Sequence, residues 1–521
     1  MAATGTVAPE LVPDRRPSAP PRRGGDCPRA APDSEQAPTN PDNQPCTSLR
    51  EPGGRTLWGP ILRTSHRKSR VVGYPNPSRH ATTGNRRLRR PTYVGAGEPD
   101  PEPETLMTDE RGADVTVPGK SATPRRLVRI GLLTLAGALA AYLALAQLIA
   151  ILPVSWVMPL LGNAVAQSAV LLLGAVRDAL GSWNMVLAVV ATALALTAFR
   201  GGERGRRLAG TVTGVAALGL VLSVVTSATL VFAARDAAGV WIPFAPAVPF
   251  STIGDPPDET VTYATVDGQP IQADLYLPAP GPRPAPLVVS IHGGAFVTGS
   301  RGTDAYTTWL ADNGYAVLDV DYRLSDEDNH RWNTADADVA CALSWAAANA
   351  QRYDWDMRRV ATFGESAGGN LAVNVANKIN AGALRPSCGS AAELPKVRAA
   401  VALYPAVDLA ASGSETALGV DAARQYLGGT PDQYPDRYSA TGAAAQVTGD
   451  SPPTLLIQGA NDHLVLAEHT AAYAATLETA RVPHRCVELP FLDHAFGTTE
   501  LDTGALVTRE LTRTWLTEYL P

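Results

Sequence analysis

The sequence predicts an α/β chain in which a mostly parallel, doubly wound sheet follows a membrane-spanning helical segment and a tail without regular structure. Three observations lead to this order. Proline and arginine are concentrated in the first 126 residues, long uncharged apolar runs fill residues 127–234, and short apolar strands alternate with helical patterns from about residue 256. Strands that alternate with helices favour a parallel sheet covered on both faces.

The first segment, residues 1–126, contains 20 of the 43 prolines and 20 of the 44 lysines and arginines. It has few large apolar side chains and cannot bury enough surface to offset the entropy of ordering, so we expect it to be disordered. Its arginine clusters have no interleaved aromatic residues, and we expect no nucleic-acid partner. Met107 is a second candidate start, and we expect residues 1–106 to lie upstream of the natural start codon.

The second segment, residues 127–234, carries the membrane signal. An uncharged run of 21 residues at 132–152 is long enough to cross a bilayer core. Runs at 186–199 and 208–234 are further candidates, whereas 154–176 is interrupted by Pro159 and Gly162. A buried soluble helical bundle is the alternative, but the summed length of uncharged sequence favours a bilayer.

Arginine positions predict the topology of this segment. Seven arginines flank the candidate spans, in two clusters: Arg125, Arg126 and Arg129, then Arg200, Arg204, Arg206 and Arg207. Both clusters are expected in the cytoplasm, which favours three crossings and an extracytoplasmic C-terminal domain. Four crossings would break the charge rule and place that domain inside. A Pro-rich linker is expected at 235–255, and its juncture at 241–250 is expected to hold the domain just off the membrane.

The third segment, residues 256–521, predicts the sheet. Strands are expected at 261–265, 271–277, 287–291, 316–321, 360–363, 397–403, 454–457 and 485–489. Helices are expected at 306–313, 334–350, 367–379, 467–480 and 505–519. The first two strands form a hairpin around Asp267-Gly268, and residues 408–450 form a small insertion. Sites in such sheets gather at the carboxyl ends of the strands.

The nucleophile candidate is Ser366, within Gly364-Glu365-Ser366-Ala367-Gly368. This G-x-S-x-G pattern follows an apolar strand and precedes a small-residue helix, which is the setting of a nucleophile elbow. Side chains at Gly364 and Gly368 would collide with the neighbouring elements, while the sharp turn exposes the serine hydroxyl.

The acid and base candidates also follow strands. Asp462 lies after the strand at 454–457, where its carboxylate can hold an imidazole in the correct tautomer. Asp408, after an earlier strand, is the alternative acid. Of the eight histidines, His494 is the base candidate, because it lies in a loop at the carboxyl end of a strand, 32 residues after Asp462. His463 adjoins the acid and His469 falls in the next helix, so neither is free to reach back, and His484 opens the final strand at the wrong end of the sheet. The order Ser, Asp, His matches the order seen in strand–turn–helix hydrolases.

The loop His292-Gly293-Gly294 follows the strand at 287–291. Two glycines let the backbone approach closely, so the N–H groups of Gly293 and Gly294, with that of Ala367, can form an oxyanion hole. His292 is expected to brace this loop rather than to transfer protons.

These residues resemble the α/β-hydrolase family, in particular the hormone-sensitive-lipase-like esterases and carboxylesterases. The matching motifs are His292-Gly-Gly-Ala295, Asp321-Tyr-Arg-Leu324, Gly364-Glu-Ser-Ala-Gly-Gly369, Asp462 and Asp493-His-Ala-Phe496. The resemblance covers roughly residues 256–521 and implies serine-dependent ester hydrolysis without a cofactor. Many relatives have a third glycine where this chain has Ala295. The tetrapeptide at 321–324 is interpreted as structural, with Arg323 pairing beneath the site.

Other functions stay open at this point. A peptidase or acyltransferase would use the same triad, and a non-catalytic membrane-anchored binding module is a further alternative. Residues 298–306 and 408–450 are expected to shape the pocket for small or short-chain esters; a lipid or a glycan could supply the ester.

The five cysteines have no metal-ligand spacing, and we expect no metal site. Cys341 is expected to be a buried apolar residue, while Cys388 and Cys486 could pair in an oxidising compartment.

Overall fold

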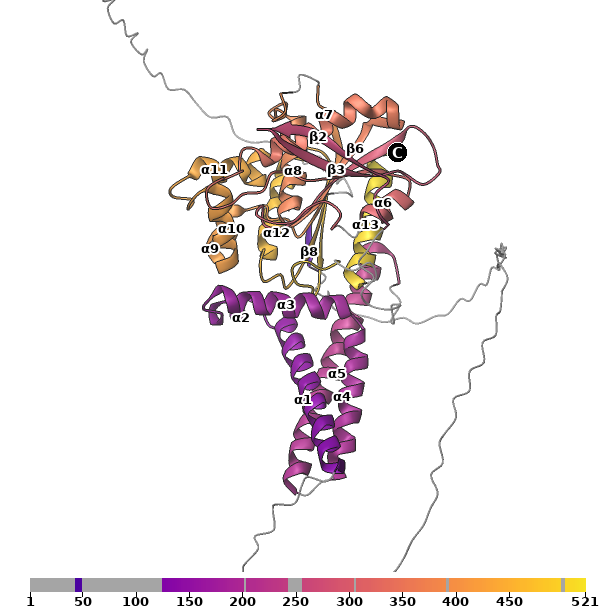
Figure 1. Cartoon of the computed structure of the whole chain (residues 1–521), viewed down its shortest axis with the longest axis vertical. Helices are drawn as coiled ribbons and strands as arrows, with labels where there is room; N and C mark the ends of the chain where they lie inside the picture. The colour runs from indigo at the N-terminus through magenta and orange to yellow at the C-terminus, as the bar shows by residue number, and fades with distance from the viewer. Residues whose placement is uncertain are drawn as a thin grey trace, which may run out of the picture.

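The protein consists of a stalk of long helices beneath an α/β domain (Figure 1). The computed structural model describes residues 43–48, 124–200, 203–241, 255–303, 306–389, 393–497 and 502–521. Most of the tail and of the linker at 235–255 lie outside these residues, and the predictions made for them stay predictions.

The α/β domain is built on a nine-stranded sheet of order β1-β9-β8-β7-β6-β4-β5-β3-β2. β2 and β3 pair as an antiparallel hairpin, β3 also pairs antiparallel with β5, and the remaining neighbours are parallel. The mostly parallel doubly wound sheet is therefore confirmed. The strands are β1 (Asn43–Ser48), β2 (Glu259–Val266), β3 (Gln269–Tyr276), β4 (Ala285–Ile291), β5 (Ala316–Val320), β6 (Trp355–Glu365), β7 (Val397–Leu403), β8 (Thr454–Gly459) and β9 (His484–Leu489).

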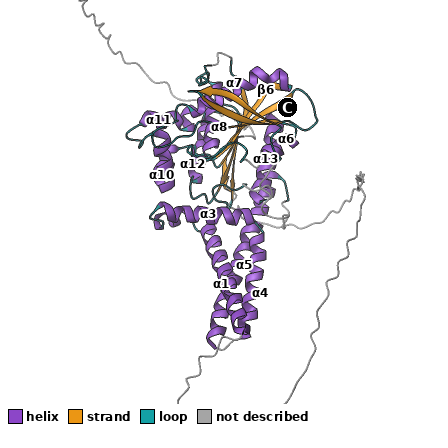
Figure 2. Ribbon diagram, viewed as in Figure 1, coloured by secondary structure: helices purple, strands orange, loops and turns teal. Residues whose placement is uncertain are grey.

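Helices cover both faces of the sheet (Figure 2). One buried apolar cluster joins the sheet to α7, α8 and α12, and a second joins its other face to α6 and α13. The helices of the domain are α6 (Thr307–Asp312), α7 (Ala335–Tyr353), α8 (Ala367–Asn380), α9 (Leu409–Glu415), α10 (Ala417–Leu427), α11 (Pro435–Thr441), η3 (Ala443–Gln446), α12 (Ala467–Thr479) and α13 (Thr503–Tyr519). The insertion expected at 408–450 comprises α9, α10, α11 and η3.

β4 illustrates how the central strands form. Its side chains alternate between the two faces: Leu287, Val289 and Ile291 belong to the cluster on the α8 face, and Val288 belongs to the cluster on the α13 face. Because both faces are buried, nearly every position is apolar, and the run reads as continuous in the sequence.

The stalk consists of α1 (Pro124–Ile151), α4 (Trp183–Thr197) and α5 (Glu203–Ala238), which lie side by side. Small residues at their contact, Ala140, Ala191 and Ala216, let the backbones approach closely. Gln147 of α1 also donates to Ser223 of α5 at 3.1 Å. α1 and α5 are each long and apolar enough to cross a membrane.

Between the stalk helices, α3 (Ala164–Leu180) lies across the base of the α/β domain (Figure 1). It follows the short helices α2 (Val154–Val157) and η1 (Met158–Leu160), and is bent by 96° from α4, which continues into η2 (Ala198–Arg200). Asn163 caps the start of α3 by accepting the N–H of Ala166, and Gly181 ends it with a φ of 48°. The interrupted run at 154–176 is thus a separate element from the stalk.

The last turns of α5 belong to the α/β domain rather than to a free linker. Leu230 and Ala234 are part of the buried cluster under α13, and Arg485 of β9 donates to the carbonyl of Ala237. Apolar packing therefore continues from the stalk into the sheet. The segment expected to hold the domain off the membrane, 241–250, lies outside the described residues except for Trp241, and that expectation stays a prediction.

Two further expectations need correction. Asn43–Ser48 forms β1, an edge strand parallel to β9, so the tail is not wholly without regular structure. Cys341 is not a free buried thiol: it forms a disulfide with Cys388, 47 residues away, and Cys388 therefore does not pair with Cys486. Cys486 is also disulfide-bonded. The bond from Cys341 anchors the loop after α8 to α7.

Candidate active site

Ser366, His494 and Asp462 come together at the carboxyl edge of the sheet. The Ser366 Oγ lies 2.9 Å from His494 Nε2, and His494 Nδ1 lies 2.8 Å from Asp462 Oδ2. Because a carboxylate only accepts, the Nδ1–H donates to Asp462 and leaves Nε2 to accept the serine proton. The three side chains form one chain of hydrogen bonds.

Asp462 is held in place from several sides and is fully buried. Its Oδ1 accepts the backbone N–H groups of Leu464 and Val465 at 2.9 and 2.8 Å. Its Oδ2 also accepts from the Gln458 amide at 2.9 Å. A carboxylate with this many donors keeps a fixed direction toward the imidazole.

Ser366 lies on a sharp turn between β6 and α8, with φ 52°. A Cβ on Gly368 would come within 2.0 Å of the Ile291 carbonyl, and one on Gly364 within 2.2 Å of the Gly368 carbonyl. The turn is therefore pressed against the end of β4 at Gly368 and closes tightly on its own backbone at Gly364, which is why both positions must be glycine. Glu365, the last residue of β6, leads into this turn.

The loop after β4 lies against the Ser366 turn. A Cβ on Gly293 would lie 3.1 Å from the Glu365 carbonyl and 3.4 Å from the Ser366 Cβ. Gly294 has φ +113°, a conformation that side chains rarely adopt. Ala295, where the resemblance expects glycine, also has a positive φ of 56°. The backbone of this loop, like that of Ala367, lies beside the serine.

The side chain of His292 supports the backbone of this loop. It is buried, stacks on Tyr322 with 4.4 Å between ring centroids, and its Nδ1 lies 2.7 Å from the Gly293 carbonyl. Burial lowers the pKa of His292, against smaller raising effects of the Gly293 carbonyl and Asp321. Tyr322, which lies 30 residues later in the chain, also donates through its hydroxyl to the His292 carbonyl at 3.1 Å.

A cavity of about 320 Å³ opens beside Ser366 and is walled mainly by apolar side chains. Its lining comes from Ala295, Phe296 and Val297, from Leu464 and Val465, and from 409–425 of the insertion. The part of the lining at 409–425 belongs to the insertion expected to shape the pocket, and the described residues of 298–306 are not among those that line this cavity. Tyr426 acts indirectly: it is buried and stacks on Phe296 at 3.9 Å.

Residues 273–477 match the BD-FAE family. Esterase LipC of Mycobacterium tuberculosis is 32% identical over 224 residues, which cover 41% of this chain and 54% of LipC. Ethyl acetate hydrolase of Pseudomonas putida is 29% identical over 260 residues, 46% of this chain and 77% of that protein. The C-terminal domain has the α/β-hydrolase fold, and these similarities support the hormone-sensitive-lipase-like branch of carboxylesterases.

Two further proteins match this domain at similar identity. The probable carboxylic ester hydrolase LipM of M. tuberculosis is 28% identical over 221 residues, 41% of this chain and 49% of LipM. A hyperthermophilic esterase from Pyrobaculum calidifontis has 28% identity and a TM-score of 0.43, covering 52% of this chain and 89% of that one. The chain spans about half the length of LipC and LipM.

The alternative acid and the other described histidines of the hydrolase domain have different partners. Asp408 is exposed and caps α9 by accepting the N–H groups of Ala410 and Ala411. The other histidine contacts are His330 with the Gln425 carbonyl, His463 with Asp493, His469 with Glu415, and His484 with the Val482 carbonyl. Arg323 forms a two-pronged ion pair with the buried Asp338, which fits its expected structural role.

Asp493 is a residue whose part in the site the sequence reasoning missed. Its Oδ1 accepts the backbone N–H groups of His463 and His494 at 2.9 and 2.8 Å, and its Oδ2 lies 2.8 Å from His463 Nδ1. One carboxylate thus joins the loop that carries the acid to the loop that carries the base. The signal in the sequence was its place directly before His494, as the first residue of the matching motif Asp493-His-Ala-Phe496, but that motif does not say what its carboxylate binds.

We predict that acid weakens the hydrolase domain through His292. Its folded pKa is lowered below the ordinary 6.5 by burial, so the unfolded chain binds the proton more readily. The stabilisation that the neutral ring contributes is present above pH 6.5 and is lost as the pH falls below it. Denaturant unfolding at pH 7.5 and 5.5 measures this loss, which should shrink in His292→Gln. An equal loss in both proteins would contradict the prediction.

Proposed function

We propose that the protein is a membrane-anchored serine esterase that hydrolyses carboxylic esters through Ser366, His494 and Asp462. The observation that carries this proposal is the chain of hydrogen bonds at 2.9 and 2.8 Å that ends on an apolar cavity. The names of the relatives, among them an ethyl acetate hydrolase, support ester hydrolysis. The substrate class is thus a small-molecule ester or the ester of a lipid or glycan.

In the proposed first half-reaction, His494 Nε2 takes the Ser366 proton as Oγ attacks the ester carbonyl. The charge on the carbonyl oxygen is stabilised by the N–H groups of Gly293, Gly294 and Ala367, which lie in the two backbone segments that meet at the serine. The imidazolium is stabilised by Asp462 and protonates the departing alcohol. The C–O bond breaks and an acyl-enzyme remains.

In the second half-reaction, His494 removes a proton from a water molecule, whose oxygen attacks the acyl carbon. The same N–H groups stabilise the second tetrahedral intermediate. Its collapse breaks the bond to Ser366, returns the proton to Oγ and releases the carboxylic acid. The groups used are side chains and backbone amides of this chain, and the proposal includes no cofactor and no metal.

Membrane anchoring is the second part of the proposal. The arginines at the start of α1 and at the η2–α5 junction lie at the end of the stalk opposite the hydrolase domain (Figure 1). Arg129 of α1 donates to the Ala198 carbonyl at 2.9 Å, which brings these two ends together. Positive charge marks the cytoplasmic end, so three crossings by α1, α4 and α5 place the hydrolase domain outside. The Cys341–Cys388 disulfide suits an oxidising compartment.

The outward face of α2–α3 suits the membrane surface. Trp156, Leu160, Val165 and Leu172 are 67%, 83%, 80% and 66% exposed, while the opposite face of α3 is buried against the hydrolase domain. A helix with one apolar and one polar face, lying across the top of a helical stalk, fits the boundary between lipid tails and head groups.

The nucleophile is tested by Ser366→Ala. We expect the variant to lose p-nitrophenyl ester hydrolysis, by a factor of about 10³ or more, because no other group attacks the carbonyl. It should also lose labelling by a fluorophosphonate probe, while its thermal unfolding stays that of the wild type. Unchanged turnover would reject this nucleophile, and an unlabelled wild-type protein would reject an activated serine.

The cavity predicts a preference for short acyl chains. Esters from C2 to C16 should give the highest kcat/KM at the short end, because the walls of 409–425 close a space of about 320 Å³. Ala422→Phe should shift the profile further toward C2. Ala444→Phe, which changes an exposed residue of the same insertion, is the matched control. A maximum at C16 would count against this reading of the cavity.

Topology is tested by fusions to alkaline phosphatase and green fluorescent protein. Three crossings predict active phosphatase after residues 153 and 521, and fluorescence after residue 201. The fusion after residue 201 is the internal control, because it should report the opposite side. Fluorescence at residue 521 without phosphatase activity would place the hydrolase domain in the cytoplasm.

A further inference from the structure

One face of α3 is buried against the hydrolase domain. The buried positions on this face are Gln167, Val170, Gly174 and Arg177, which lie three or four residues apart, and Asp178, which lies four residues after Gly174. Gln167 Oε1 accepts the N–H of Ala417 at the start of α10 at 2.7 Å. Just before α2, the Leu152 carbonyl accepts from Asn461, the neighbour of Asp462, at 3.0 Å. The membrane segment therefore contacts both the insertion and the acid loop.

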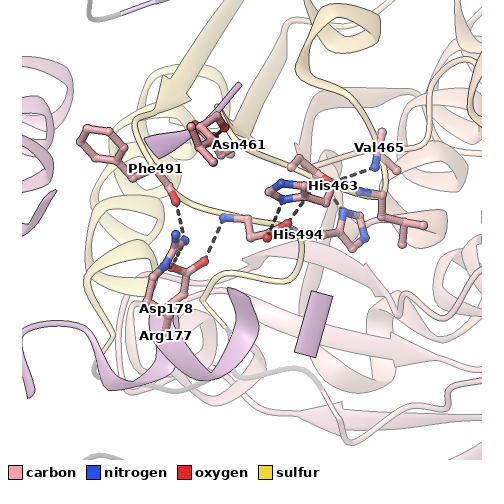
Figure 3. A network of polar contacts seen from close by, with 12 residues as sticks. Arg177, Asp178, Asn461, His463, Val465, Phe491 and His494 are labelled. Carbon is pink, nitrogen blue, oxygen red and sulfur yellow. Dashed lines mark hydrogen bonds and ion pairs between the residues drawn. The ribbon is translucent and has the colours of Figure 1, made fainter. Parts of the chain in front are cut away.

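The tightest contacts are with the loop that carries His494 (Figure 3). Asp178 Oδ2 accepts the backbone N–H of Asp493 at 2.9 Å. Arg177 donates to the carbonyl of Phe491 in the same loop and, through Nε, to Asp178 Oδ1 at 2.9 Å. Both charged side chains are only 5–6% exposed. An ion pair this far from water needs such partners, since burial of unpaired charge is costly.

Gly174, one turn earlier on the same face, allows this close approach. A Cβ at this position would lie 2.3 Å from Asp493 Oδ2 and 2.8 Å from its Cβ. The side chain of Asp493 therefore rests directly on the backbone of α3. Any side chain larger than hydrogen at 174 would displace it.

These contacts act on the base through a single residue. Asp178 fixes the N–H of Asp493, and the carboxylate of Asp493 fixes the N–H of His494 at 2.8 Å. His494 Nε2 in turn lies 2.9 Å from Ser366 Oγ. A shift of the loop would therefore change the distance over which the proposed proton transfer takes place.

α3 is itself fixed to the stalk. Asn184 of α4 donates to the carbonyls of Arg177 and Gly181 at 2.9 and 2.7 Å, across the bend between the two helices. Tyr142 of α1 donates to Asn184 Oδ1 at 2.9 Å. Hydrogen bonds thus run without interruption from two stalk helices to the loop of the base.

We propose that Arg177 and Asp178 are positioning residues for the esterase: the membrane segment supplies, in cis, the brace that holds His494 in line with Ser366. The inference rests on the proposed function and adds that the hydrolase domain does not complete its own active site. A displacement of about 1 Å can cost roughly a hundredfold in rate. Loss of the brace should therefore lower kcat by about 10- to 100-fold. KM should change by less than about threefold, because neither Arg177 nor Asp178 lines the cavity beside Ser366.

Two paired substitutions in the full-length, detergent-solubilised protein test this. Arg177→Met with Asp178→Ala removes both charges together, so no unpaired charge is left, and also removes the acceptor for Asp493 N–H. Arg177→Gln with Asp178→Asn removes the same charges but keeps an amide oxygen as acceptor. We expect the first pair to show the loss in kcat and the second to keep activity within about threefold of the wild type.

A second test needs no change of charge. Gly174→Ala adds a methyl group against Asp493 and should lower kcat, whereas Gly214→Ala in α5, where nothing lies within 4 Å of an added Cβ, should not. Both substitutions raise helix propensity equally. Hydrogen exchange of the 491–496 peptide supplies a readout apart from turnover: it should become faster in the first pair and in Gly174→Ala, and stay slow in the two controls.

The outcomes separate this inference from the proposed function. The positioning role is overturned if the folded Met/Ala pair and Gly174→Ala both keep the wild-type kcat, or if KM alone changes. Neither result touches the proposed esterase function. Equal losses in the Met/Ala and Gln/Asn pairs also overturn it, because the acceptor would then not matter. A wild-type protein no more active than Ser366→Ala rejects both proposals.

Discussion

The contact between the Ser366 turn and the end of β4 is the constraint on which the site depends. Gly368 lies so close to the Ile291 carbonyl that even a methyl group would not fit. This contact places the start of α8 beside the loop of Gly293 and Gly294, so two stretches of backbone N–H groups meet at one serine. The sheet holds both stretches at fixed register, since β4 and β6 pair directly from Leu287 and Val360 to Ile291 and Gly364. The positive φ of Ser366 persists because the surrounding packing leaves no alternative.

Much of this arrangement could be predicted because its signals are local. The G-x-S-x-G turn, the His-Gly-Gly loop and the buried strands each depend on neighbours within a few residues, and the sheet then brings their ends together. The Cys341–Cys388 disulfide, the pairing of β1 with β9, and the contacts of Asp493 depend on segments far apart in the chain, and no periodicity encodes them. Arg177-Asp178 could be seen only as a pair of charges at the end of an apolar run. What they face is decided by the bend at Gly181 and by the fold of a different segment.

The site has two buried carboxylates with separate tasks. Asp462 accepts from the imidazole of His494. Asp493 accepts the backbone N–H groups of His463 and His494, and so joins the loop of the acid to the loop of the base. Buried carboxylates are costly unless each oxygen has donors, and here the donors are backbone N–H groups and histidine rings. The cost of burial is thus offset by contacts that also fix the geometry. Groups held in this way cannot relax into water when a neighbour changes, which makes the arrangement sensitive to the elements packed around it.

The end of α5 has a practical meaning for anyone who wishes to work with the hydrolase domain alone. Leu230 and Ala234 fill part of the core beneath α13, and Ala237 accepts a hydrogen bond from Arg485. A polypeptide trimmed to begin at residue 256 would lack these α5 side chains and so leave part of the apolar cluster next to α13 open to solvent. Aggregation of such a fragment would then result from the absent α5 side chains rather than from an unstable sheet. A soluble fragment would need either the final turns of α5 or polar substitutions along α13.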